Sequence, residues 1–162
     1  MEVDLEKEYN ILKKKYTKLP EFNEINVMFE LSVFEPRFAN NSLFARYLRK
    51  VCSSYVENLC NFFTNLIHPN QSFMIGMQES KFIDDKDRKM LSDVIRENMI
   101  LLRWASATTL IYKEEKEIEA ILKIHEQMKK NKKTLQDVFN KLKTGWETVL
   151  DEKKEKSHSY VG

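Results

Sequence analysis

Glycine and proline are scarce in this chain, which has three of each in 162 residues. So few turn residues exclude an all-β sandwich, and they exclude the glycine-rich loops that hold nucleotide phosphates. No run of about 18 uncharged apolar residues occurs, as a membrane-spanning helix would need. The first residues include Glu2 and Asp4 and lack the basic-then-apolar pattern of a secretory signal. We therefore expect a cytoplasmic, all-helical protein that makes no contact with a membrane.

Cysteine is limited to Cys52 and Cys60. If both lie on one helix, eight positions separate them by about 12 Å along the axis, which is too far for a disulfide. We predict that both are buried, reduced thiols, as is usual in cytosolic proteins. The net charge of +2 provides no general attraction for nucleic acid.

Apolar residues recur at intervals of three and four almost throughout the chain, which predicts amphipathic helices. We expect an up-and-down, all-α bundle of four long helices plus short helices, joined by two apolar loops. The bundle should occupy residues 1–150 as one domain, and residues 151–162 should form a charged, mobile tail. Helices are expected at 3–19, 42–67, 84–112, 114–130 and 134–150, and the apolar loops at 27–41 and 71–82.

Two helix breaks are part of this prediction. The first lies near 112–114, where an apolar run gives way to alternating Lys and Glu, and the second lies at 131–133. The segment 99–112 holds Arg103 as its only charge, so we place it at the centre of the bundle. The Arg103 side chain either extends to the bundle edge or contacts an anion.

The pattern of ionisable residues predicts no catalytic residue, no metal ligand and no cofactor. His68, His125 and His158 have no zinc-binding spacing with one another or with cysteine. We interpret His125 as a residue at the edge of the core, and His68 as a residue at a helix C-terminus. Nucleophile motifs are also missing, so we do not expect an enzyme.

Lysine is concentrated between positions 123 and 143, where seven lysines accompany only Glu126 and Asp137. This excess is either an ordinary solvated helix face or a surface that contacts phosphates. No aromatic residue is interleaved in 129–133, which argues against single-strand binding. The candidate basic surface consists of Lys129, Lys130, Lys132, Lys133, Lys141 and Lys143.

The last three residues, Tyr160, Val161 and Gly162, form a second candidate contact. They combine an aromatic side chain with a terminal carboxylate at the end of a polar spacer, an arrangement that partner proteins capture. Two alternatives stay open, a frayed end or a tail folded back onto the bundle.

Three short stretches carry a resemblance to known proteins. They are Leu19–Ile25 continuing to Phe29–Ser32, Lys81–Asp85, and Tyr160–Gly162. Together they resemble a family of small, uncharacterised archaeal proteins that are all helical. The resemblance implies a helical fold, and it implies that the terminal tail is a regular part of these proteins. It implies no activity.

The function that we predict from these observations is a non-catalytic interaction or adaptor module, which binds a protein or a ribonucleoprotein. The alternative is a helical protein that binds nucleic acid or the ribosome through its lysine-rich faces. Dispersed lysines would favour the first, and one contiguous basic face the second. The sequence does not indicate an oligomeric state.

Overall fold

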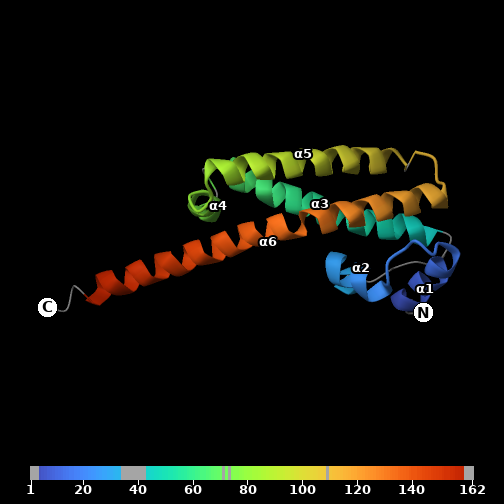
Figure 1. Ribbon diagram of the computed structural model, residues 1–162, viewed down its shortest axis with the longest axis horizontal. Coiled ribbons are helices and arrows are strands. Elements are labelled where there is room, and N and C mark those ends of the chain that lie inside the picture. Colours follow the sequence, from blue (N-terminus) through green and yellow to red (C-terminus); the bar gives the residue numbers. More distant parts are fainter. Residues whose placement is uncertain (1–3, 34–42, 71, 73, 109, 159–162) are drawn as a thin grey trace. The chain divides into compact units, whose positions relative to one another are not determined.

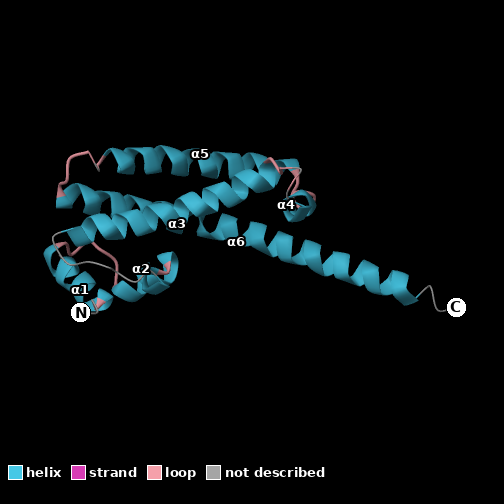
Figure 2. Cartoon of the chain, turned by 180° about the vertical axis from the view of Figure 1, so that it is seen from behind, coloured by secondary structure: helices cyan, strands magenta, loops and turns pink. Residues whose placement is uncertain are grey.

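The computed structural model describes residues 4–33, 43–70, 72, 74–108 and 110–158, and for 152–158 only the helical backbone. Every regular element in these ranges is a helix, which confirms the all-α prediction (Figures 1 and 2). The α-helices are α1 (Leu5–Lys15), α2 (Phe22–Phe29), α3 (Phe44–Ile67), α4 (Met74–Glu79), α5 (Asp85–Ala107) and α6 (Glu114–His158), with a 3₁₀ turn η1 (Leu31–Val33) after α2.

The chain divides into two compact units. Unit 1 contains Met1–Cys60 and Glu97–Lys129, and unit 2 contains Asn61–Arg96 and Lys130–Gly162. The boundary falls within α3, α5 and α6, so each of these three helices contributes residues to both units.

The first helix of unit 1 is shorter than predicted. Asp4 caps α1 by accepting a hydrogen bond from the Lys7 amide, and the helix ends at Lys15 instead of near Leu19. The chain then turns so that the buried Tyr9 hydroxyl donates to the Pro20 carbonyl. Lys13 donates to the Leu19 carbonyl from the same side. These two side chains stabilise the turn, so the helix does not reach Pro20.

The predicted apolar connector at 27–41 is wrong in its first part. Helix α2 continues to Phe29 and ends at Glu30, whose positive φ of 53° forms a left-handed C-cap. Ile25, Phe29 and Leu31 are completely buried, because α2 and η1 turn their apolar residues into unit 1. The Phe29 ring meets Tyr55 of α3 edge-on, with ring centres 5.7 Å apart.

Helix α3 matches its prediction closely. Its broad apolar stripe is buried, including Leu48, Val56 and Phe63. Cys52 and Cys60 extend that stripe as buried thiols that form no disulfide, as predicted. Burial raises the pKa of both, to about 11 for Cys60, which disfavours the reactive thiolate at neutral pH.

Unit 2 contains a short helix where an apolar loop was predicted. Helix α4 occupies Met74–Glu79, followed by the buried Ser80 and a turn into α5. Arg88 of α5 donates to the carbonyls of Ile67, at the end of α3, and Ser80, after α4, at 3.0 and 2.5 Å. One guanidinium thus satisfies carbonyls near the ends of two helices, which have no partner within their own helix.

The start of α5 agrees with the sequence, and its end does not. Asp84 and Asp87 cap the helix reciprocally, each side chain accepting from the other's amide at 2.8 and 3.1 Å. The helix ends at Ala107, where the Thr108 hydroxyl donates to the Ala105 carbonyl. Ile100, Leu110 and Ile111 are 66, 86 and 72 % exposed, so the expectation that residues 99–112 form the centre of the bundle is wrong.

The two predicted C-terminal helices are one helix of 45 residues. Helix α6 begins at Glu114, as expected from the first break, and passes through 131–133 without the second. The break fails because the apolar stripe continues across it: Met128, Asn131 and Leu135 are all buried on one face. The long helices are therefore three, α3, α5 and α6, in place of the four predicted. Residues 151–158 continue α6, where a frayed tail was expected.

Candidate functional site

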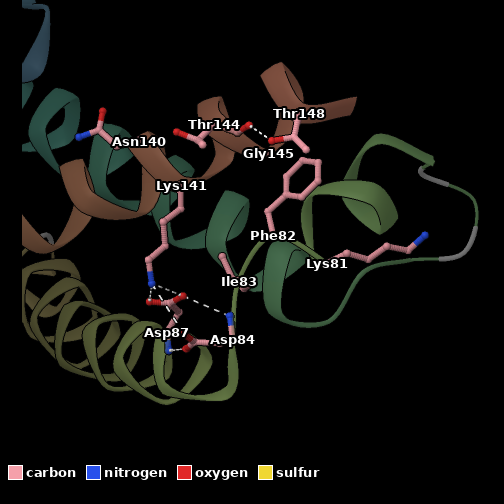
Figure 3. A pocket seen from close by; sticks show the side chains of 10 residues that line it. All are labelled: Lys81, Phe82, Ile83, Asp84, Asp87, Asn140, Lys141, Thr144, Gly145 and Thr148. Carbon is pink, nitrogen blue, oxygen red and sulfur yellow. Dashed lines mark hydrogen bonds and ion pairs between the residues drawn. The ribbon is translucent and has the colours of Figure 1, made fainter. Parts of the chain in front are cut away.

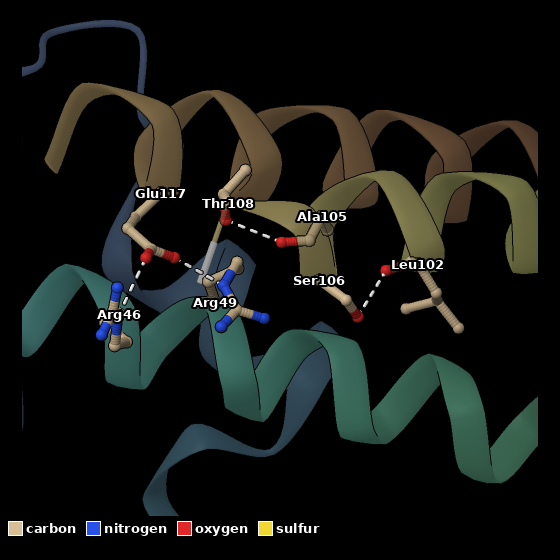
Figure 4. A network of polar contacts seen from close by, with 7 residues as sticks. All are labelled: Arg46, Arg49, Leu102, Ala105, Ser106, Thr108 and Glu117. Atoms are coloured by element: carbon tan, nitrogen blue, oxygen red, sulfur yellow. Dashed lines mark hydrogen bonds and ion pairs between the residues drawn. The ribbon is translucent and has the colours of Figure 1, made fainter. Parts of the chain in front are cut away.

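A group of buried charges joins α3 to α6 in unit 1. Glu117 of α6 has no exposed surface, and its two carboxylate oxygens accept from Arg46 at 3.1 Å and from Arg49 at 2.5 Å (Figure 4). The Arg46 guanidinium also lies 4.8 Å from the centre of the Tyr112 ring. Arg49 is 3 % exposed, and its Nη2 atom has no hydrogen-bond partner among the described residues.

The chemistry of this group is that of an internal ion pair. Carboxylate and guanidinium each lose their hydration on burial, and only the partner compensates for that loss. Removing Glu117 leaves Arg49 buried without its counter-charge, whereas removing Arg49 leaves Glu117 with Arg46 as its partner. Glu117 belongs to the run of alternating Lys and Glu that follows the first predicted helix break, and sequence reasoning did not single it out as buried. Its position on the stripe that continues to Ile121 and Ile124 is the signal that could have identified it as buried.

His125 lies where the sequence placed it, at the edge of the core. It is 8 % exposed, and its Nε2 atom is 3.2 Å from Oε1 of Glu24 on α2, an oxygen that Lys129 also contacts at 3.1 Å. Burial lowers the pKa of His125, outweighing the opposite effect of Glu24. The hydrogen bond from Lys129 lowers the pKa of Glu24. This group attaches α2 to α6 within unit 1.

Arg103 takes the first of the two arrangements considered for it. Its side chain is 65 % exposed, and the nearest carboxylate contact joins its Nη2 atom to Glu57 at 3.8 Å. His68 follows the last residue of α3, and its amide donates to the Thr64 carbonyl. His158 lies in the last turn of α6, where side chains are not described.

Unit 2 contains an open groove of about 590 Å³ between α6 and the segment that leads into α5 (Figure 3). Lys141 of α6 closes one end by contacting Asp87 at 2.6 and 2.7 Å. This hydrogen bonding raises the pKa of Lys141, so its charge is committed to Asp87. The groove is lined by Lys81, Phe82, Ile83, Asp84, Asp87, Asn140, Lys141, Thr144, Gly145 and Thr148.

Gly145 lines this groove at a position that has no room for a larger residue. The Phe82 ring lies directly over Gly145, where a Cβ atom would come within 2.5 Å of Cδ2 and 2.6 Å of Cδ1. The same ring meets Trp146 edge-on at 5.6 Å, and Trp146 Nε1 donates to Glu79 at 3.0 Å. Gly145 thus allows the chain before α5 to approach α6 closely. Sequence reasoning did not identify this close approach.

The six candidate basic residues all lie on α6, but they are not equivalent. Lys129 pairs with Glu24 in unit 1, and Lys141 pairs with Asp87 in unit 2. Lys143 is 74 % exposed and 3.7 Å from Glu147. Lys132 and Lys133 are exposed and make no hydrogen bond or ion pair with the described residues. Lys130 is also exposed.

Helix α4 presents an apolar surface that the sequence did not single out. Met74, Ile75 and Met77 are 82, 53 and 40 % exposed, whereas Gly76 and Ser80 are buried. An amphipathic helix usually buries its large apolar residues, whereas here the small residues face unit 2 and the large apolar residues face solvent. Sequence reasoning placed a loop here and therefore had no face to assign.

Two kinds of site are absent from the described residues. No group of three or more His, Cys, Asp or Glu side chains is arranged to hold a metal ion within the described ranges. None of the helices there combines the length and apolar character that crossing a bilayer requires. The candidate contacts Tyr160, Val161 and Gly162 lie outside the described residues.

Comparison with known protein families, curated proteins and solved structures finds no match to this chain. The resemblance to small archaeal helical proteins and the cytoplasmic location therefore stay predictions.

Proposed function

We propose that this chain is a non-catalytic interaction module that binds a partner protein through α4. The observation that carries the proposal is the outward placement of Met74, Ile75 and Met77 on one short helix. Exposed apolar side chains gain free energy when another apolar surface covers them and removes them from water, which is why contiguous apolar patches are typical of protein contacts. Methionine suits this role because its flexible thioether adapts to the shape of a partner.

The attachment of α4 to unit 2 supports this reading. Glu79 accepts a hydrogen bond from Trp146, and the Ser80 carbonyl accepts one from Arg88, so the C-terminal end of α4 is held on its polar side. The apolar side is then presented on a fixed element, and a partner would not have to order it on binding. We infer a partner whose contact face is predominantly apolar.

The test compares partner recovery by three versions of the full chain. Met74→Ser, Ile75→Ser and Met77→Ser together remove the α4 surface. A matched control changes two other exposed apolar residues, Val27 (73 % exposed) and Leu110 (86 %), to Ser. All are solvent-exposed, so the free energy of unfolding of each variant should stay within about 0.5 kcal/mol of the wild-type value.

Each version is used as bait in nuclease-treated native lysate, and the recovered proteins are quantified by mass spectrometry. We expect a set of proteins common to the wild type and the control and depleted with the α4 variant. A recovered partner should then bind the purified chain with a negative heat-capacity change, the signature of apolar burial. Equal recovery by all three versions would exclude α4 as the contact surface.

A further inference from the structure

The continuity of α6 through 131–133 creates a polar stripe that a helix break would have divided. At about 100° per residue, positions 132, 133, 136, 140 and 143 fall within roughly 100° of the helix circumference. All five side chains are exposed, and Leu135, Val138 and Leu142 are buried on the opposite side. The stripe rises about 16 Å along the axis. It lies wholly in unit 2 and consists of Lys132, Lys133, Gln136, Asn140 and Lys143.

The stripe contains three ammonium groups and two amides, and no carboxylate. Asp137 lies at its edge, one helical turn before Lys141, and Glu147 follows its end. Lys132, Lys133, Gln136 and Asn140 make no hydrogen bond or ion pair with the described residues. The charge of Lys141, by contrast, is committed to Asp87. Lys143 lies 3.7 Å from Glu147, so four of the five residues are available donors, and the stripe keeps a net positive charge.

From this placement we propose that the stripe binds the phosphate backbone of a nucleic-acid duplex. In a duplex each strand carries one phosphate per 3.4 Å of axis, so about 16 Å of helix faces roughly five phosphates of one strand. Lysine, glutamine and asparagine side chains all donate to phosphate oxygens. No aromatic residue belongs to the stripe. The neighbouring Phe139 stacks on Phe62 and meets Phe63 at a tilt, so single-stranded bases find no stacking platform.

This activity goes beyond the proposed protein contact and rests on a different surface. Because three lysines neutralise about three phosphates, the binding constant should fall with salt with a log–log slope near −2.7. Contacts limited to phosphates predict little dependence on base sequence.

The experiment measures anisotropy of labelled 20-base-pair DNA and RNA duplexes with the full chain between 20 and 200 mM KCl. The test variant carries Lys132→Gln, Lys133→Gln and Lys143→Gln. The matched control, with the same charge change, carries Lys18→Gln, Lys86→Gln and Lys89→Gln, three lysines that are exposed elsewhere. Circular dichroism checks that both fold.

We expect the test variant to lose at least tenfold in affinity at 20 mM KCl and to flatten the salt slope, with the control within twofold of the wild type. Absence of duplex binding by the wild type, an equal loss in the control, or binding of polyglutamate in place of duplex would overturn the proposal. The Met74, Ile75 and Met77 variant should bind duplex normally, so failure here and failure of the α4 contact are distinguishable.

Discussion

Replacing Gly145 with alanine tests whether side-chain packing or helix propensity has the larger effect on stability in this part of α6. Propensity alone predicts stabilisation, since alanine is favoured over glycine in a helix interior by about 1 kcal/mol. Packing predicts the opposite, because the new Cβ atom would lie 2.5 and 2.6 Å from two carbons of the Phe82 ring. Overpacking of this kind costs about 1–3 kcal/mol.

Moving the Phe82 ring aside to relieve this clash would itself cost free energy. The ring meets Trp146 edge-on, and Trp146 is in turn held by its hydrogen bond to Glu79. Displacing the ring would sacrifice an aromatic pair, which contributes about 0.5–1.5 kcal/mol. Adding these costs and subtracting the propensity gain, we expect Gly145→Ala to destabilise the chain by about 0.5–3.5 kcal/mol.

The measurement is urea denaturation of the wild type, Gly145→Ala, Phe82→Ala and the double variant. With Phe82 removed the clash disappears, so the glycine substitution should become neutral or stabilising by up to about 1 kcal/mol. Thr144→Ala, on the neighbouring exposed position, is the control and should change stability by no more than about 0.5 kcal/mol. Stabilisation by Gly145→Ala in the wild-type background would refute the packing argument.

Three other outcomes are expected. Glu117→Gln should lower the free energy of unfolding by about 3–5 kcal/mol, because Arg49 keeps a buried charge without its counter-charge. The surface control Arg103→Gln should lower it by less than about 1 kcal/mol. Similar losses of unfolding free energy in the two variants, measured by urea denaturation, would contradict this. Burial lowers the pKa of His125 below its ordinary 6.5, so as pH falls below about 6.5 the unfolded chain binds the proton first and the free energy of unfolding decreases. The variant His125→Gln should lessen that decrease between pH 7 and 5. Parallel plots of unfolding free energy against pH for the variant and the wild type would contradict this. The buried Cys60 thiol should react with a bulky thiol reagent much more slowly in native than in urea-unfolded protein, and equal rates would show that it is accessible.

Much of the helical architecture could be read from local patterns. The interval between apolar residues predicted α3 almost residue by residue, and the acidic residues at 84–87 predicted the start of α5. The change from apolar to alternating charge located the turn before Glu114. Local capping and periodicity act within a few residues, so they leave a signal that a single sequence carries.

The candidate surfaces were predicted less well than the helices. Asn131 and two lysines were interpreted as a break, although Met128, Asn131 and Leu135 keep the helical interval. Asparagine is only a mild helix breaker, and burial of a continuous face outweighs that preference. The apolar face of α4 was missed for the converse reason, since six residues are too few to show a period.

The sequence by itself determined the all-helical class, the two buried thiols and the concentration of lysine between positions 123 and 143, because composition and periodicity are properties of neighbouring residues. Only the tertiary structure decided which charges are available. Lys141 meets Asp87, 54 positions away, and Glu117 meets Arg49 across 68 positions. It also decided that Gly145 must stay small beneath Phe82. Contacts between distant residues depend on how the helices pack, and a local pattern carries no record of that packing.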